Sequence, residues 1–184
     1  MKALYYEKYG DISVLKQGEL DDPKVVPDEE VLIKVKYFGL NPLDYKLRSG
    51  MLKLMTFPTF PRTIGSDFSG EIIALGKNVK NFKVGDNVFG FLSQLNKGVS
   101  SQLLTANESI LSLIPSNTDL PEASAVPLAA LTSYQALVQL AKVRKGNKVL
   151  INGASGGTGI FAVQIAKMLG SSVTSITSDR NIRW

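Results

Sequence analysis

The sequence predicts a protein of the α/β class in two parts: a β-rich, barrel-like domain over residues 1–118, and a strand–helix–strand unit within residues 119–184. Two observations indicate this division. In the first part, short apolar segments alternate with frequent glycines, which is typical of a small barrel or sandwich. In the second part, an alanine- and leucine-rich stretch leads into a strand, a glycine-rich turn, a helix and another strand.

The first part contains clear strand signals. Residues 31–38 alternate between apolar and charged side chains, so we expect a half-buried strand whose inner face carries the odd-numbered residues, Tyr37 included. Residues 68–75 form a second strand candidate, bounded by glycines. Residues 85–87 read Gly-Asp-Asn, which predicts a turn between short strands, the first of them over residues 82–84.

The second part begins with helix. Pro121 suits a first helical turn, where its missing N–H costs nothing. Residues 122–143 carry no strand-like alternation, and we expect Pro127 to divide this helical stretch into two pieces. Lysine and arginine crowd its end, where cations are favourable, and Gly146 is the expected stop.

A strand–helix–strand pattern follows. Residues 148–152 form a short apolar run typical of a buried parallel strand, and residues 153–159 are rich in glycine. Residues 160–169 have helical periodicity, and residues 172–177 form a second strand.

The glycine-rich segment is the strongest functional signal. Gly153, Gly156 and Gly159 are spaced G-x-x-G-x-x-G between a strand and a helix, and Gly157 is an additional glycine. The pyrophosphate of a dinucleotide needs backbone N–H groups at a helix N-terminus, which a Cβ on the turn would keep at a distance. The alternative is a tight turn without a ligand, but the flanking strands and helix favour nucleotide binding.

The end of the second strand selects the cofactor. Arg180 and Ser178 suit the 2′-phosphate of NADPH, whereas Asp179 would favour NADH if it faced the ribose. We therefore expect NADPH rather than NADH; alternatively, Arg180 is a surface residue at the start of a helix. The predicted cofactor-binding residues are Gly153, Ser155, Gly156, Gly157, Thr158, Gly159, Ser178 and Arg180.

Two absences exclude whole classes of chemistry. The chain has no cysteine and no histidine, which excludes disulfides, thiolate catalysis, a Ser-His-Asp triad and a zinc site built from Cys and His. No clustered Asp/Glu motif suggests a magnesium site, so we expect no metal. The difficult chemistry is then expected from an organic cofactor.

Composition also limits partners and location. The net charge of +5 is spread along the chain without interleaved aromatic residues, so we expect a solvated surface and no nucleic-acid partner. The alternative, a nucleic-acid-binding barrel, predicts strongly salt-dependent binding. No apolar run approaches the roughly 18 residues of a membrane span, and the charged N-terminus lacks the apolar region of a secretory signal. A cytoplasmic protein with a small-molecule partner is expected.

Four motifs occur in order along the whole chain, and with them the sequence resembles the quinone oxidoreductase-like branch of the medium-chain dehydrogenase/reductase superfamily. The motifs are Asn41-Pro-Leu-Asp44 with Arg48-Ser-Gly50, then Gly65-Ser-Asp67-Phe-Ser-Gly70, then Gly76 with Phe82-Lys-Val-Gly-Asp86, and finally Ala125-Val-Pro127 with Leu131-Thr132-Ser-Tyr134.

The resemblance implies a GroES-like β-barrel catalytic domain followed by the first βαβ part of a Rossmann fold. Zinc-dependent members place a Cys where Asn41 stands and a His where Ser66 stands, so the similarity is to zinc-free members. It implies hydride transfer from NADPH to a quinone or an α,β-unsaturated carbonyl acceptor. Asn41 and Thr132 are then the catalytic candidates, as neutral hydrogen-bonding groups near the nicotinamide or the substrate carbonyl. Tyr45 is a further candidate proton donor, and Asn41 before Pro42 is also a good turn residue.

The resemblance covers little more than half of a usual family member, since only the first two strands of the Rossmann fold are present. Residues 149–151 would then expose an open apolar edge. We expect the 184-residue chain to bind NADPH weakly and to have little turnover. Full-length members of the family are homo-oligomeric. The alternative function is a non-catalytic nucleotide-binding or structural protein that keeps the family fold.

Overall fold

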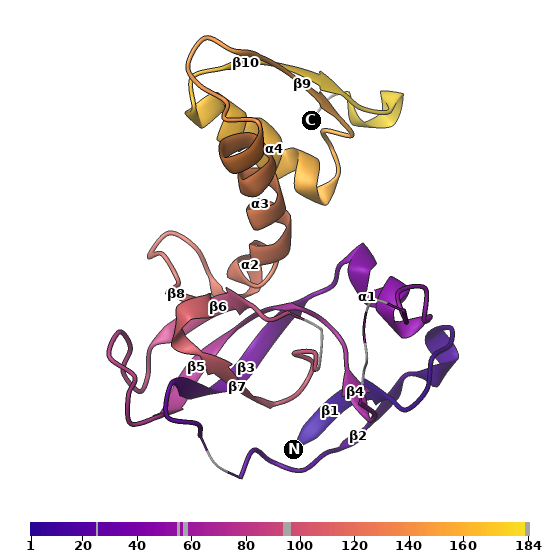
Figure 1. The fold of residues 1–184 in the computed structure, drawn as a ribbon, viewed down its shortest axis with the longest axis vertical. Coiled ribbons are helices and arrows are strands. Elements are labelled where there is room, and N and C mark those ends of the chain that lie inside the picture. The colour runs from indigo at the N-terminus through magenta and orange to yellow at the C-terminus, as the bar shows by residue number, and fades with distance from the viewer. Residues whose placement is uncertain (25, 55, 57–58, 94–96, 183–184) are drawn as a thin grey trace. The chain divides into compact units, whose positions relative to one another are not determined.

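The computed structural model describes the chain except for residues 25, 55, 57–58, 94–96 and 183–184. It divides into two units, Met1–Pro127 and Leu128–Trp184, which follow one another along the colour bar of Figure 1. The sequence pattern suggests a boundary after residue 118; the division of the structure keeps the short helix α2 (Leu120–Ala123) in unit 1. Each unit has its own cluster of buried apolar side chains.

Unit 1 is built from two antiparallel sheets. Its strands are β1 (Lys2–Tyr6), β2 (Lys16–Glu19), β3 (Glu30–Gly39), β4 (Arg62–Thr63), β5 (Asp67–Leu75), β6 (Asn87–Phe91), β7 (Leu103–Asn107) and β8 (Leu111–Leu113). The five-stranded sheet has the order β7–β3–β5–β6–β8, and the three-stranded sheet has the order β2–β1–β4. Ala3 bridges to Ser101, and the N–H of Gln102 donates to the Lys2 carbonyl at 3.0 Å, which joins β1 to the segment before β7.

The remaining elements of unit 1 are short. Besides α2 they are helix α1 (Pro42–Arg48) and the 3₁₀ turns η1 (Ile12–Val14) and η2 (Glu108–Ile110). The buried cluster of unit 1 comes mainly from strands of the five-stranded sheet, and Ile110 of η2 packs against it. Its members are Val31, Ile33, Phe68, Ile72, Val88, Val99, Leu104, Ala106 and Leu111.

The strand predicted over residues 31–38 is confirmed as β3, but the inner face predicted for Tyr37 is wrong. The side chain of Tyr37 is 47% exposed. Between Val35 and Tyr37 the register of β3 with β5 shifts, which leaves Lys36 as the extra residue of a bulge. A bulge reverses the alternation beyond it, so Phe38 packs against the buried cluster instead.

The strand predicted over residues 68–75 is confirmed as β5. The predicted turn is confirmed at Gly85, whereas Asn87 is already the first residue of β6. Gly85 has φ +91°, and its N–H donates to the Ile72 carbonyl at 2.8 Å. The strand predicted over residues 82–84 is wrong. There the N–H of Lys83 donates to the Asp86 carboxylate at 2.9 Å, so a side chain rather than a strand partner takes this donor.

Unit 2 carries the predicted strand–helix–strand pattern. Its elements are α3 (Pro127–Tyr134, beginning at the last residue of unit 1), the π-helical segment η3 (Gln135–Leu140), β9 (Lys148–Asn152), α4 (Gly157–Met168), β10 (Ser172–Ile176) and the 3₁₀ turn η4 (Asp179–Asn181). β9 and β10 pair in parallel, from Lys148 with Ser172 to Asn152 with Ile176, as predicted. Their buried cluster consists of Leu137, Ile151, Ala154 and Ala166.

The helical stretch before β9 is divided at Pro127, as predicted, but it ends earlier than expected. Leu140 is the last helical residue, Ala141 is the C-cap, and Lys142 follows with a left-handed φ of +51°. Gly146 therefore is not the helix stop. With φ +86° it forms the turn into β9, where its N–H donates to the Gly170 carbonyl at 2.9 Å. No helix within the described ranges combines the length and apolarity needed to cross a bilayer.

Candidate functional site

The glycine loop, residues 153–159, connects β9 to α4. Gly153 has φ +74°, a conformation that favours glycine, and its N–H donates to the Ile176 carbonyl at 3.0 Å. Gly156 is the N-cap of α4, with extended backbone, and its N–H donates to the Gly153 carbonyl at 2.9 Å. The loop is thereby closed on itself and leads directly into the helix N-terminus.

Backbone donors gather at the start of α4. Within the described part of the chain, the N–H groups of Gly157, Thr158 and Gly159 have no acceptor; the first donor bonded inside the helix is Ile160, which donates to the Gly156 carbonyl at 2.9 Å. Every α-helix leaves such donors in its first turn, and the helix dipole adds partial positive charge there. The start of α4 is therefore suited to an anionic group such as a phosphate.

The glycines of the loop serve two different purposes. A Cβ at Gly159 would collide with the Gly153 carbonyl oxygen and would lie 2.7 Å from Ala154 Cα, so a glycine is needed there for close packing of helix against strand. A Cβ at Gly157 would meet nothing within 4 Å. Gly157 thus lines open space beside the free N–H groups, which is the geometry that a phosphate cradle requires.

A polar contact links the glycine loop to the end of β10. The hydroxyl groups of Ser155 and Thr177 lie 2.6 Å apart, and Asn181 Nδ2 donates to Ser155 Oγ at 3.0 Å. Ser155, predicted to bind the cofactor, therefore also fixes the segment that follows β10. The roles of Thr177 and Asn181 were not predicted from the sequence, where their position directly after the second strand is the only signal for them.

Ser178 and Arg180 lie directly after β10, at the position where the residues that distinguish NADPH from NADH were predicted. Ser178 is the N-cap of η4, and Arg180 lies in its last turn. Both side chains are exposed, as is that of Asp179 between them. The segment after β10 therefore offers one cation and one carboxylate to solvent, so both the NADPH and the NADH interpretation have a residue at this position.

Asn41 caps helix α1 and is held by two carboxylates. Its backbone N–H donates to Asp44 Oδ2 at 2.6 Å, and its side-chain Nδ2 donates to Asp67 Oδ2 at 2.9 Å. Asp44 is 6% exposed and Asp67 is fully buried. The role of Asp67 beside Asn41 was not predicted from the sequence, because only the pairing of Gly39 with Asp67 across β3 and β5 brings the two residues together.

Thr132 belongs to unit 2, whereas Asn41 belongs to unit 1. Thr132 lies on α3, is exposed, and donates its hydroxyl proton to the Leu128 carbonyl at 2.7 Å. The adjacent Ser133 is buried and donates to the Thr158 carbonyl of the glycine loop, also at 2.7 Å. Ser133 thus joins α3 to the start of α4, a contact that the sequence pattern did not reveal.

Tyr45, the further candidate proton donor, lies on α1 with 49% of its side chain exposed. Within the described ranges no three His, Cys, Asp or Glu side chains are grouped so as to hold a metal ion.

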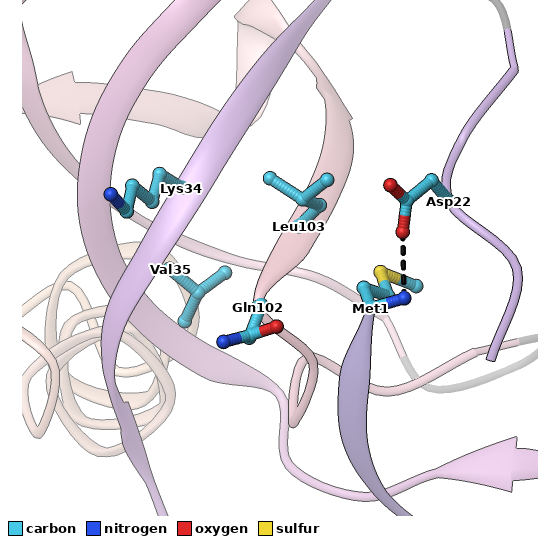
Figure 2. Close-up of a pocket in the computed structure, with 6 residues that line it drawn as sticks. All are labelled: Met1, Asp22, Lys34, Val35, Gln102 and Leu103. Carbon is cyan, nitrogen blue, oxygen red and sulfur yellow. Dashed lines mark ion pairs between the residues drawn. The ribbon is translucent and has the colours of Figure 1, made fainter. Parts of the chain in front are cut away.

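Unit 1 also has a shallow pocket of about 290 Å³, which contains none of the predicted site residues. Figure 2 shows its lining: Met1, Asp22, Lys34, Val35, Gln102 and Leu103. The ammonium group of Met1 pairs with Asp22 at 2.7 Å, and Gln102 Oε1 accepts the N–H of Lys2 at 2.9 Å. Two of its polar groups therefore hold the first residues of the chain in place.

The comparisons with known proteins agree with this arrangement. Residues 27–116 match the family model described as the alcohol dehydrogenase GroES-like domain. The chain is 36% identical to a chloroplastic quinone-oxidoreductase homolog of Spinacia oleracea, over 99% of this chain and 57% of that protein. It is 37% identical to the quinone oxidoreductase of Homo sapiens, over 92% of this chain and 50% of that protein.

Solved structures give the same picture. The quinone oxidoreductase of Coxiella burnetii superposes with a TM-score of 0.87 at 35% identity, over 98% of this chain and 57% of that one. The Escherichia coli quinone oxidoreductase complexed with NADPH superposes with a TM-score of 0.84 at 25% identity, over 100% of this chain and 55% of that one. The predicted fold class, a GroES-like domain with the first Rossmann strands, is confirmed. The chain spans little more than half the length of these relatives.

Proposed function

Because the chain belongs to the quinone oxidoreductase-like branch of the medium-chain dehydrogenase/reductase superfamily, we propose that it is an NADPH-dependent oxidoreductase. Its acceptor would be a quinone or an α,β-unsaturated carbonyl compound, reduced without zinc. The observation that carries the proposal is the set of free N–H groups at the start of α4, beside a glycine whose missing Cβ leaves open space.

Residues of unit 2 would hold the cofactor. The N–H groups of Gly157, Thr158 and Gly159 would donate to the pyrophosphate, because they have no acceptor among the described residues. Ser133 and Ser155 would keep the loop in place through their contacts with Thr158 and Thr177. When bound, the nicotinamide ring supplies the hydride.

The preference for NADPH rests on Arg180 and Ser178. A guanidinium group binds a phosphate through paired charge-assisted hydrogen bonds, and both side chains are exposed to a ligand at the end of β10. The Escherichia coli relative, crystallised with NADPH, supports this choice. Asp179 is the residue that would favour NADH.

The class of acceptor is supported by the names of relatives and by composition. One relative, 35% identical, is the 2-methylene-furan-3-one reductase of Solanum lycopersicum, and the CurK enoyl reductase superposes with a TM-score of 0.89. The 184 residues contain no cysteine or histidine with which to bind zinc. An acceptor whose added charge spreads over a conjugated system fits such a chain, since it needs less polarisation by a Lewis acid.

Asn41 and Thr132 would act as neutral hydrogen-bonding groups. Asp67 takes one N–H of the Asn41 amide, and the same nitrogen carries a second N–H that could donate to a carbonyl oxygen. The hydroxyl of Thr132 donates to Leu128 and can still accept a hydrogen bond. Neither group releases a proton easily at neutral pH, so water would protonate the product.

The same contacts favour a second candidate, a nucleotide-binding protein of the family without turnover. Asn41 and Thr132 each already donate one side-chain hydrogen bond within the protein, to Asp67 and to the Leu128 carbonyl. A cytoplasmic location and a homo-oligomeric assembly also stay predictions; two of the relatives carry the word chloroplastic in their names.

The test is a titration of the 184-residue chain with NADPH and NADH, followed by cofactor fluorescence, and then a measurement of NADPH oxidation with a quinone acceptor. The reductase proposal expects saturable NADPH binding that Arg180→Gln weakens, whereas Arg144→Gln, an exposed control in the same unit, leaves it unchanged. Oxidation near 1 s⁻¹ or faster would establish turnover. Saturable binding without any oxidation would favour the second candidate, and absence of binding at millimolar NADPH would refute both for this chain.

A further inference from the structure

The guanidinium group of Arg62 on β4 is buried and has no hydrogen-bond partner in the part of the chain that the structure describes. Arg62 is the largest of the fully buried side chains among the described residues, with 1% of its surface exposed. Among the described residues, none supplies an acceptor to the three guanidinium nitrogens, Nε, Nη1 and Nη2. A guanidinium group carries five N–H donors and stays charged at every pH that proteins tolerate.

Arg48 provides a second unsatisfied cation. It is the last residue of α1, and its carbonyl accepts the N–H of Gly10 at 3.0 Å. Its Nη1 is buried and finds no acceptor on any residue that the structure describes. The neighbouring Gly50 faces the ring of Tyr9, since a Cβ there would lie 3.0 Å from Tyr9 Cγ. The aromatic ring of Tyr9 thus lies next to the C-terminal end of α1.

A chain of aromatic rings connects the two arginines. Arg62 lies opposite Tyr6 in the register of β4 with β1. The ring of Phe60 meets Tyr6 edge-on at 5.8 Å and Tyr9 edge-on at 5.5 Å. We call Tyr6, Phe60 and Tyr9 the aromatic trio; it has Arg62 beside one end and the end of α1 beside the other.

The Tyr6 phenol experiences both cations. Burial raises the pKa of Tyr6 above its ordinary value of 10.0, while the positive charges of Arg62 and Arg48 act in the opposite direction. Tyr6 is therefore neutral at pH 7 and adds an O–H donor to a group that already has an excess of donors. Asp44, the one carboxylate that also acts on Tyr6, accepts the N–H of Asn41. Asp11, a second carboxylate that interacts with Arg48, is exposed and accepts hydrogen bonds from Ser13. Two arginines beside the one buried carboxylate of Asp44 therefore leave the buried part of the cluster with a positive charge.

An anion would both neutralise the buried positive charge and accept hydrogen bonds from the unsatisfied donors. A buried charge without a partner is strongly unfavourable, and a water molecule could satisfy donors but not neutralise the charge. The planar fork of a guanidinium group matches the paired oxygens of a carboxylate or a phosphate group. A halide could neutralise the charge but would satisfy fewer of the donors.

We propose that Arg62 and Arg48, beside the aromatic trio, form a binding site for a small oxyanion of the carboxylate or phosphate class. All residues of the site belong to unit 1, and none belongs to the glycine loop. The proposal therefore does not depend on the proposed reductase function. Occupation of the site stabilises unit 1, because the anion binds the folded chain and not the unfolded one.

The experiment is a thermal unfolding titration of the full chain with sodium formate, acetate and phosphate against sodium chloride, at constant ionic strength. The wild-type chain is expected to show a saturable rise of Tm with at least one oxyanion and none with chloride. Arg62→Gln is expected to lose the saturable rise and, without oxyanion, to be at least as stable as wild type, since it removes an uncompensated charge. Arg144→Gln, which removes an exposed arginine, keeps the full response.

The outcomes separate the sources of the effect. A rise with formate and acetate assigns a carboxylate ligand, whereas a saturable rise with phosphate alone assigns a phosphate ligand. If Arg62→Gln does not fold, Arg48→Gln takes its place, because Arg48 is only partly buried; it is expected to weaken the response at least threefold in anion concentration. A wild-type chain without a saturable rise, or an equal rise in the arginine variants, would overturn the proposal.

Discussion

The side-chain amide of Asn41 donates to the carboxylate of Asp67 at 2.9 Å and thereby ties the N-cap of α1 to the first residue of β5. Asp67 is fully buried, and Asp44 accepts the backbone N–H of the same asparagine at 2.6 Å. The two acidic residues fix both the main chain and the side chain of Asn41. Any ligand that Asn41 binds would meet an amide whose orientation is already determined.

Asp67→Ala is expected to lower the free energy of unfolding by about 2 kcal/mol, because it leaves the Asn41 amide without its acceptor and opens a buried space. The measurement is the urea midpoint of unit 1. Asp21→Ala, an exposed replacement of the same kind, should change stability by less than about 0.5 kcal/mol. Equal effects of the two variants would show that the Asn41 contact does not stabilise the fold.

Gly159→Ala and Gly157→Ala are expected to act in different ways. The first forces a methyl group against the Gly153 carbonyl and Ala154, so unit 2 should lose at least about 2 kcal/mol of stability. The second enters open space and should leave stability unchanged or raise it by up to about 1 kcal/mol, since alanine favours a helix. If phosphate binds there, Gly157→Ala should weaken NADPH at least tenfold. Unfolding and cofactor titration of both variants check this, and unaltered NADPH affinity in Gly157→Ala would place the pyrophosphate elsewhere.

The Tyr6 phenol is expected to make unit 1 sensitive to alkali. Burial raises the pKa of Tyr6 in the folded chain above the ordinary value of 10.0. The stability from the neutral buried phenol is then fully present below pH 10 and is lost as the pH rises through the folded-state pKa. Unfolding midpoints from pH 8 to about 11.5 should fall less steeply for Tyr6→Phe than for wild type. Tyr45→Phe, which removes a half-exposed phenol, should follow the wild-type curve.

Hydrogen exchange is expected to differ between the two units. β9 and β10 form a two-stranded sheet in which Leu150 is 65% exposed and Ile176 is 47% exposed, whereas β3 pairs on both sides and carries the fully buried Val31 and Ile33. Amides of β9 and β10 should therefore exchange at least tenfold faster than those of β3, because local opening exposes less apolar surface there. Mass spectrometry of exchanged peptides measures this, and equal protection of the two sets of amides would contradict the expected difference in local stability.

Much of the candidate cofactor site was predictable because its parts are close in sequence. The strand, the glycines and the helix of residues 148–169 follow directly from periodicity and spacing, and the parallel pairing of β9 with β10 confirmed them. The contact of Ser133 with the glycine loop was not predictable, because its hydroxyl donates to the carbonyl of Thr158, which lies too far along the sequence for any local pattern to connect the two. The end of the helical stretch before β9 was not predicted correctly, because Lys142 adopts a left-handed conformation that is uncommon for lysine.

The sequence by itself determined the order of strands and helices, the glycine loop, and the absence of cysteine and histidine, because these depend on residue type and local spacing. Only the tertiary structure decided that Tyr37 faces solvent, that Asp67 holds Asn41, and that the Arg62 guanidinium is buried with no acceptor from the described segments. Each of these depends on strand register, and register depends on bulges and on contacts between distant segments. A one-residue shift between β3 and β5 is invisible in the sequence, yet it decides which side chains meet.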